Sequence, residues 1–196
     1  MADIKAIIKN NKDDIIKPVA VLLAICIIIP LALSVTNKIT AEKIARLETE
    51  NSNKNMALLV KAESYKRCET NGIVYYAAVN GGNTAAYIFT ESAKGYGGDV
   101  SVMTAVNTDG TVLGTAILDV SNETPGLGQN AAKEGFYSQF KWLKKGISLL
   151  KNGADGEKNE INAVTGATIT SAAVTRAVNA ALDDFDKVRE AESGEE

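Results

Sequence analysis

The chain has 196 residues, of which 45% are hydrophobic and 23% charged, and its formal net charge is −3. This length and composition suit one core-forming domain, and the interspersed charges exclude the clustered basic face that nucleic-acid binding needs. The lack of histidine excludes a Ser-His-Asp triad, a His-ligated zinc and a His-ligated haem. Cys26 and Cys68 are too few for a standard iron–sulfur cluster, and no disulfide is expected because Cys26 lies in an apolar run. Any redox chemistry must therefore use an organic cofactor.

Residues 18–36, PVAVLLAICIIIPLALSVT, form an apolar run without a charge. A helix needs about 20 such residues to cross the core of a bilayer, so the run predicts one transmembrane helix. A cleaved signal peptide and a buried core helix are the alternatives; the run is long for the first and lacks the polar face typical of the second. Residues 1–17 have a slight lysine excess, which predicts a cytoplasmic N-terminus and a domain outside the cytoplasm.

Residues 37–71 are interpreted as a helical stalk, with a break expected at Asn51-Ser52-Asn53 because these residues compete with the helix backbone for hydrogen bonds. From Gly72 the pattern changes to β-branched and aromatic residues typical of strands. Turn signals at 81–83 and 107–110 divide this region into antiparallel strands. The predicted strands are 73–79, 84–90, 99–106 and 111–120.

Loops and helices follow these strands. Residues 123–128 are expected to form a stiff loop, and a short helix is predicted from Phe136 through Phe140 to Trp142. Residues 169–189 give the clearest helical pattern, with a single apolar face. That face consists of Val174, Val178, Ala181, Phe185 and Val188. The acidic residues 190–196 are expected to form a frayed tail. Residues 72–189 thus predict an α+β domain, an antiparallel sheet with flanking helices, after one N-terminal transmembrane helix.

The junction before the 169–189 helix is rich in hydroxyl groups and reads INAVTGATITS over residues 161–171. Unpaired N–H groups and the positive end of the helix dipole make such a terminus an anion site, suited to a phosphate. The candidate binding residues are Thr165, Gly166, Ala167, Thr168, Thr170 and Ser171. The alternative is an ordinary helix cap, which Thr170 or Ser171 alone would satisfy.

This junction resembles the flavinylation motif Asp-x-x-(Ser/Thr)-Gly-Ala-Thr of the FMN-binding domain family. In that family the last threonine is esterified to the FMN phosphate, which implies covalent FMN on Thr168. Asn162 stands in the position of the family's aspartate, a departure that either weakens recognition by the modifying enzyme or is tolerated. The resemblance also implies that a separate flavin transferase attaches FMN, drawn from FAD.

Two further stretches carry the resemblance. Residues 123–128, ETPGLG, and 94–98, KGYGG, are similar to a loop and a turn found in two members of the family. These members are the G subunit of the Rnf complex and the C subunit of the sodium-translocating NADH:quinone reductase. Three motifs in the family's order, after one apolar span, cover nearly the whole chain, and the short length is closer to the Rnf G subunit.

The 123–128 loop supplies further candidate cofactor-binding residues, namely Glu123, Thr124, Gly126 and Leu127. Gly126 permits close backbone approach, Thr124 can hydrogen-bond the flavin or its phosphate, and Leu127 can cover the ring. Glu123 is interpreted as a solvated charge, and the alternative for the whole loop is a conformational turn that binds nothing. Tyr96 and Trp142 can stack on a flavin, but core packing is their expected use.

The resemblance implies a membrane-anchored electron-transfer subunit with covalent FMN, part of an ion-translocating ferredoxin:NAD oxidoreductase (Rnf) complex in a bacterial or archaeal cytoplasmic membrane. The expected partners are the other membrane subunits, the flavin transferase and the lipid bilayer. One uncharged span offers no ion path, so the chain is not expected to move ions alone. The alternatives are a flavinylated carrier of another extracytoplasmic electron-transfer system and a flavin-free membrane-anchored binding or scaffold module.

Overall fold

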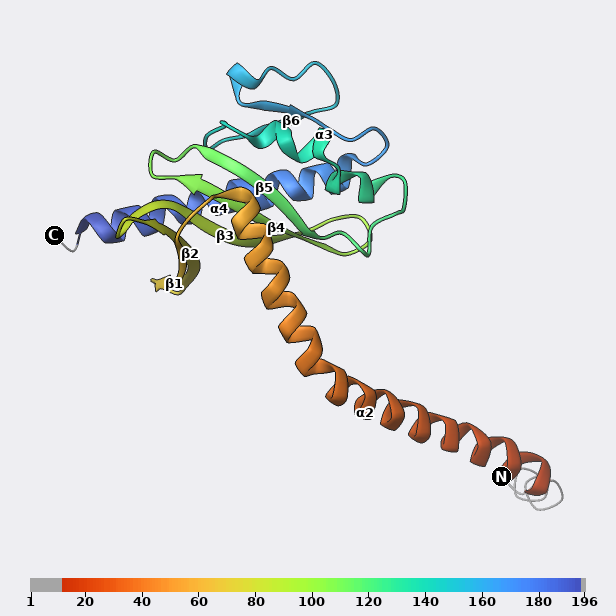
Figure 1. Cartoon of the computed structure of the whole chain (residues 1–196). Helices are drawn as coiled ribbons and strands as arrows, with labels where there is room; N and C mark the ends of the chain where they lie inside the picture. The colour runs from red at the N-terminus through yellow and green to blue at the C-terminus, as the bar shows by residue number, and fades with distance from the viewer. Residues whose placement is uncertain (1–11, 195–196) are drawn as a thin grey trace. The chain divides into compact units, whose positions relative to one another are not determined.

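The computed structural model describes residues 12–194 (Figure 1). The chain divides after Asn51 into two compact units. The first contains most of helix α2 (Lys12–Leu59), and the second contains the end of that helix together with the described strands. Lys5 and Lys9, which contribute to the predicted orientation, and residues 195–196 of the predicted tail lie outside the described residues.

Helix α2 contains the predicted membrane span. Its segment Ile16–Ala41 is long and apolar enough to cross a bilayer, and no other helix among residues 12–194 meets the same criterion. The predicted break at Asn51-Ser52-Asn53 is wrong, because α2 continues to Leu59. Asparagine and serine each cost about 0.7 kcal/mol or less inside a helix. Burial of Met56 against the sheet stabilises the last turns and outweighs that cost.

Five strands form one antiparallel sheet in the order β1-β2-β3-β4-β5. They are β1 (Ser64–Thr70), β2 (Ile73–Asn80), β3 (Asn83–Lys94), β4 (Asp99–Asn107) and β5 (Val112–Asp119). The four predicted strands correspond to β2 through β5, and β3 extends four residues beyond its predicted end at Thr90. Lys94 pairs with Asp99, and Ser101 pairs with Asp119. The turn after β3 and the loop after β5 therefore leave the sheet at the same end.

Strand β1 lies inside the segment predicted to be a helical stalk, so that part of the prediction is wrong. Its sequence, SYKRCET, forms a largely exposed edge strand and shows no apolar alternation. Asn71 and Gly72 both have positive φ angles, 52° and 80°, and join β1 to β2 in a two-residue hairpin. Asn-Gly is the preferred sequence for such a turn, since both central residues need the left-handed region.

The main core lies between the sheet and helix α4 (Thr168–Gly194), which packs across β3 and β4 (Figure 1). The predicted apolar face of this helix is confirmed: Val174, Val178, Ala181, Phe185 and Val188 are all buried. The alternate side chains of the strands form a second cluster around Met56 of α2, on the opposite face. The five-stranded sheet is thus covered on both faces, which confirms the predicted α+β class.

The C-terminal end of α4 is ordered by contacts to the sheet. The hydroxyls of Tyr75 and Tyr87 donate to Glu192 at 3.3 and 2.7 Å. Helix α4 continues to Gly194, so the predicted frayed tail is wrong for residues 190–194. The acidic composition suggested fraying, but the tyrosine hydroxyls give one of these carboxylates a fixed place.

Short elements connect β5 to α4. They are η1 (Gly128–Ala132), α3 (Glu134–Tyr137), η2 (Ser138–Phe140), β6 (Ser148–Leu150), η3 (Gly156–Lys158) and β7 (Glu160–Asn162). The predicted short helix is broken into pieces and ends at Phe140. Trp142 is 63% exposed with Lys141 over its ring, so its predicted core packing is wrong. The parallel pair β6–β7 was not predicted, because three-residue strands are too short to show periodicity.

Candidate functional site

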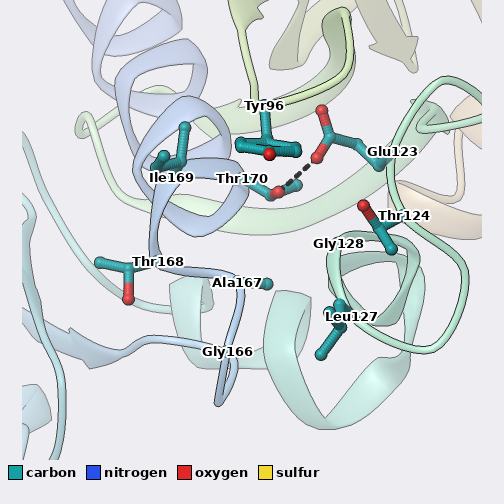
Figure 2. A pocket seen from close by; sticks show the side chains of 10 residues that line it. All are labelled: Tyr96, Glu123, Thr124, Leu127, Gly128, Gly166, Ala167, Thr168, Ile169 and Thr170. Atoms are coloured by element: carbon teal, nitrogen blue, oxygen red, sulfur yellow. Dashed lines mark hydrogen bonds between the residues drawn. The ribbon is translucent and has the colours of Figure 1, made fainter.

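A cavity of about 500 Å³ opens at the N-terminal end of α4. Its walls come from the turn between β3 and β4, the loop after β5 and the first turn of α4 (Figure 2). The lining residues are Tyr96, Glu123, Thr124, Leu127, Gly128, Gly166, Ala167, Thr168, Ile169 and Thr170. Because β3 and β5 end at the same end of the sheet, the three sequence motifs meet here.

Most of the predicted site residues line this cavity, and three do not. Gly126 has a φ of 77° that shapes the 123–128 loop, and its carbonyl accepts from Asn130 at 2.5 Å. Thr165 lines two neighbouring hollows instead. Ser171 is buried within the start of α4. Sequence reasoning missed Gly128 and Ile169 as lining residues.

Tyr96 lines the cavity mouth and is 72% exposed, so its predicted core packing is wrong. The signal available in the sequence was its position between Gly95 and Gly97. A turn flanked by glycines leaves the sheet, and an aromatic side chain at its tip has no core to enter. The exposed ring is therefore free to contact a molecule in the cavity (Figure 2).

Neither Thr170 nor Ser171 forms the helix cap that was the alternative to an anion site. The Ser171 hydroxyl accepts from the N–H of Val164 and donates to the Ala167 carbonyl, both outside the helix. The Thr170 hydroxyl donates to Glu123. Among residues 12–194, no acceptor is present for the N–H groups of Thr168, Ile169 and Thr170, the first three of the helix. These open donors, together with the helix dipole, make an anion site.

Thr168 is the first residue of α4, and its side chain is exposed. It lines the main cavity and also an adjoining hollow of about 260 Å³ that contains Lys151. Figure 2 shows Thr168 apart from Thr170 and Glu123, which face one another. Of the two threonines in the first turn of α4, Thr170 is buried and its hydroxyl is engaged, whereas Thr168 is exposed to solvent.

Glu123 is buried, with 2% of its surface exposed, so its interpretation as a solvated charge is wrong. Its Oε1 accepts from the Gly97 N–H at 2.9 Å, and its Oε2 accepts from the Thr170 hydroxyl at 2.5 Å. Burial by itself raises the pKa of this carboxyl. The bonds from Thr170 and from the backbone of the 94–98 turn outweigh burial and hold the pKa below its ordinary value. Glu123 is therefore a carboxylate at neutral pH.

Three glycines lie close to the Glu123 carboxylate, at positions where a larger residue would not fit. A Cβ on Gly95 would overlap Oε1 of Glu123, and one on Gly97 would overlap the carbonyl oxygen of Asn122. A Cβ on Gly128 would lie 2.6 Å from Oε2 of Glu123. The two glycine-containing motifs thus pack against each other with Glu123 between them, and the glycines permit this close approach.

Acidification is expected to destabilise the cavity through Glu123. Because its pKa is lowered by folding, its contribution to stability is fully present above the ordinary glutamate pKa of about 4.3 and is lost as the pH falls through the lower folded value. Thermal unfolding of the full chain at a series of acidic pH values measures this loss. The Glu123→Gln variant should show a shallower decline. Parallel pH curves for the two proteins would contradict the role of Glu123.

Asn162, the departure from the family's aspartate, lies outside the main cavity and fixes the segment before it. Its side-chain Oδ1 accepts from the Ala154 N–H at 3.0 Å, and its backbone exchanges hydrogen bonds with the Gln139 side chain. A carboxylate oxygen would accept the same bond. Compared with the family's aspartate, Asn162 therefore keeps a hydrogen-bond acceptor for Ala154 and lacks the negative charge beside Thr165.

The residues present fit a phosphate-bearing planar cofactor. The cavity volume falls in the range of small-molecule sites. Gly166 has a φ of 76°, and a Cβ there would come within 3.0 Å of Leu127, so glycine keeps this edge open. The N–H groups of α4 suit a phosphate, and the apolar side chains of Leu127 and Ile169 suit a ring.

One known protein family matches the part of the chain that forms this cavity. Residues 95–183 match the family model described as FMN-binding domain, a range that includes the 123–128 loop and the start of α4. Residues 95–183 therefore correspond to an FMN-binding domain.

Curated relatives identify the group within the class. The chain is 38% identical over 159 residues to the G subunit of the proton-translocating ferredoxin:NAD(+) oxidoreductase complex of Clostridium ljungdahlii, covering 81% of this chain and 84% of the relative. It is 31% identical over 186 residues to the G subunit of the Na(+)-translocating ferredoxin:NAD(+) oxidoreductase complex of Acetobacterium woodii, covering 84% and 88%. The chain belongs to the family of Rnf G subunits, which are FMN-binding domain proteins.

Solved structures agree on the fold. The C subunit of the Na(+)-translocating NADH-quinone reductase from Parabacteroides distasonis matches 58% of this chain and 61% of its own length, with 26% identity and a TM-score of 0.50. Shewanella oneidensis NqrC matches 67% and 71%, with 20% identity and a TM-score of 0.54.

Proposed function

We propose that the chain is a membrane-anchored electron-transfer subunit of an ion-translocating ferredoxin:NAD oxidoreductase (Rnf) complex, and that it carries FMN as a phosphoester on Thr168. The observation that carries the proposal is the exposed Thr168 hydroxyl beside three open N–H groups, at a cavity built from three motifs. The names of the curated relatives support the complex, and the family match supports FMN.

Each part of the site has a separate task in this proposal. The first turn of α4 holds the phosphate through its N–H groups, while Lys151 in the adjoining hollow adds a positive charge. Leu127, Tyr96 and Ile169 cover the ring. FMN supplies one- and two-electron redox chemistry when bound, and the protein supplies its position and polarity. A covalent link keeps the cofactor with a domain that would otherwise lose it by dilution.

Attachment requires a separate enzyme. The only ionisable carboxylate lining the cavity is Glu123, and its two oxygens already accept from Gly97 and Thr170. The chain contains no histidine that could activate Thr168. A flavin transferase is therefore proposed to remove the hydroxyl proton, so that the Thr168 oxygen bonds to phosphorus and AMP leaves from FAD.

The test is in-gel fluorescence under denaturing conditions after co-expression with a flavin transferase. A fluorescent band at the position of the full chain, dependent on the transferase, is expected. A chain that folds but yields no band would contradict covalent attachment and favour a flavin-free anchored module. Co-purification of the remaining membrane subunits with the tagged full chain tests its place in the complex, and their absence would favour a carrier of another system.

The proposed orientation places residues 18–36 of α2 in the lipid bilayer, the segment before them in the cytoplasm and the FMN-binding domain outside the cytoplasm. Glu157 lies exposed in η3, so Glu157→Cys in a Cys26→Ser, Cys68→Ser background reports the side of the domain. A membrane-impermeant maleimide is expected to label it in intact cells. Asn10→Cys in the same background is the matched control and should be labelled only after permeabilisation. The reverse pattern would contradict the orientation.

A further inference from the structure

We infer that the buried carboxylate of Glu123 lowers the reduction potential of a flavin held in this cavity. The inference rests on the FMN site proposed above. It concerns the chain's own charge at that site, and it assigns to Glu123 a role beyond holding the loop in place.

Glu123 is an isolated charge. Among the ten residues that line the cavity it is the only charged one, and the others are neutral or apolar. Within residues 12–194, no lysine or arginine forms an ion pair with it. Its partners are the neutral hydroxyl of Thr170 and the N–H of Gly97. Such dipoles stabilise a carboxylate but leave its net charge of one in place.

The charge is also poorly screened. With 2% of its surface exposed, Glu123 has little direct contact with water or salt, so its charge is screened less than that of an exposed carboxylate. Reduction adds negative charge to a flavin. A fixed negative charge in the same cavity opposes that addition and thereby lowers the potential.

The position of the charge is set by packing. Gly95 and Gly97 lie so close to Glu123 and Asn122 that no side chain fits at either position, and Gly128 is equally tight against Glu123 within the loop. Thr170 of α4 fixes the second carboxylate oxygen (Figure 2). Because its hydrogen bonds come from two other segments, the 94–98 turn and α4, the carboxylate cannot rotate out to solvent without breaking both bonds. The carboxylate therefore has a fixed place in the cavity wall.

The experiment is spectroelectrochemical titration of the flavin-loaded full chain in detergent. Glu123→Gln keeps the shape of the side chain and removes its charge. The reduction potential of the flavin in this variant is therefore expected to be higher than in the wild type. Glu123→Asp keeps the charge and is expected to remain below the Gln variant. Glu157→Gln, an exposed carboxylate outside the cavity, is the matched control and should leave the potential unchanged.

A Gln variant with a potential at or below the wild type, or equal shifts in the Gln and Asp variants, would overturn the inference. Thr170→Val supplies an independent arm if the Gln variant does not fold. It keeps the charge but removes one donor, so the potential should fall, and a value at or above the wild type would overturn the inference. A wild-type chain without flavin would refute the proposed function instead.

Discussion

Thr168→Val is expected to abolish flavin retention under denaturing conditions. Valine keeps the β-branched shape and removes only the hydroxyl that would form the ester. Because Thr168 is exposed, the substitution should change the free energy of unfolding by about 0.5 kcal/mol or less. The in-gel fluorescence of the full chain, co-expressed with the flavin transferase, should therefore fall to background in a folded protein.

Two matched variants separate attachment from other effects of losing a hydroxyl. Thr90→Val makes the same change at an exposed position of β3, outside both the cavity and the motif, and should keep the fluorescent band. Thr168→Ser keeps a hydroxyl at the attachment position and should also keep it. Wild-type fluorescence from Thr168→Val would place the attachment on another residue.

Gly97→Ala should have the largest effect on stability. The new Cβ would overlap the backbone oxygen of Asn122, which cannot move away as a flexible side chain would. Either the turn or the loop must shift, and the hydrogen bond from the Gly97 N–H to Glu123 is lost with it. Overpacking of this kind destabilises by about 3 kcal/mol. Urea unfolding of the full chain in detergent, followed by circular dichroism, measures the change.

Gly135→Ala is the matched control for this substitution. A Cβ there meets nothing within 4 Å, and Gly135 lies in α3 with no positive φ angle. Its free energy of unfolding should stay within about 0.5 kcal/mol of the wild type. If the two variants unfold at the same urea concentration, the two glycine-containing motifs do not pack as described.

The sequence predicted those parts of the fold whose signals are local. Strands β2 to β5 alternate and are separated by turn residues, and the apolar face of α4 repeats at helical spacing. Strand β1 was missed because an exposed edge strand needs no apolar face. The continuity of α2 was missed because burial of Met56, a tertiary contact, overrides the weak local preference of the asparagines.

In the candidate site, too, the features with local sequence signals were predicted and those that depend on distant residues were not. The motifs at 94–98, 123–128 and 165–168 could each be seen, since glycine, proline and threonine at fixed spacing stand out. The burial of Glu123 could not be seen, because its partners Gly97 and Thr170 lie 26 and 47 residues away. The exposure of Tyr96 depends likewise on how the turn leaves the sheet.

Peptide mass spectrometry of the mature protein identifies the residue that carries FMN. Trypsin is expected to release residues 159–176, which contain Thr165, Thr168, Thr170 and Ser171, after Lys158 and at Arg176. This peptide is expected to gain the mass of FMN less one water, and its fragment ions are expected to assign the gain to Thr168. An unmodified peptide from transferase-containing cells, or the gain on another residue, would contradict attachment of FMN to Thr168.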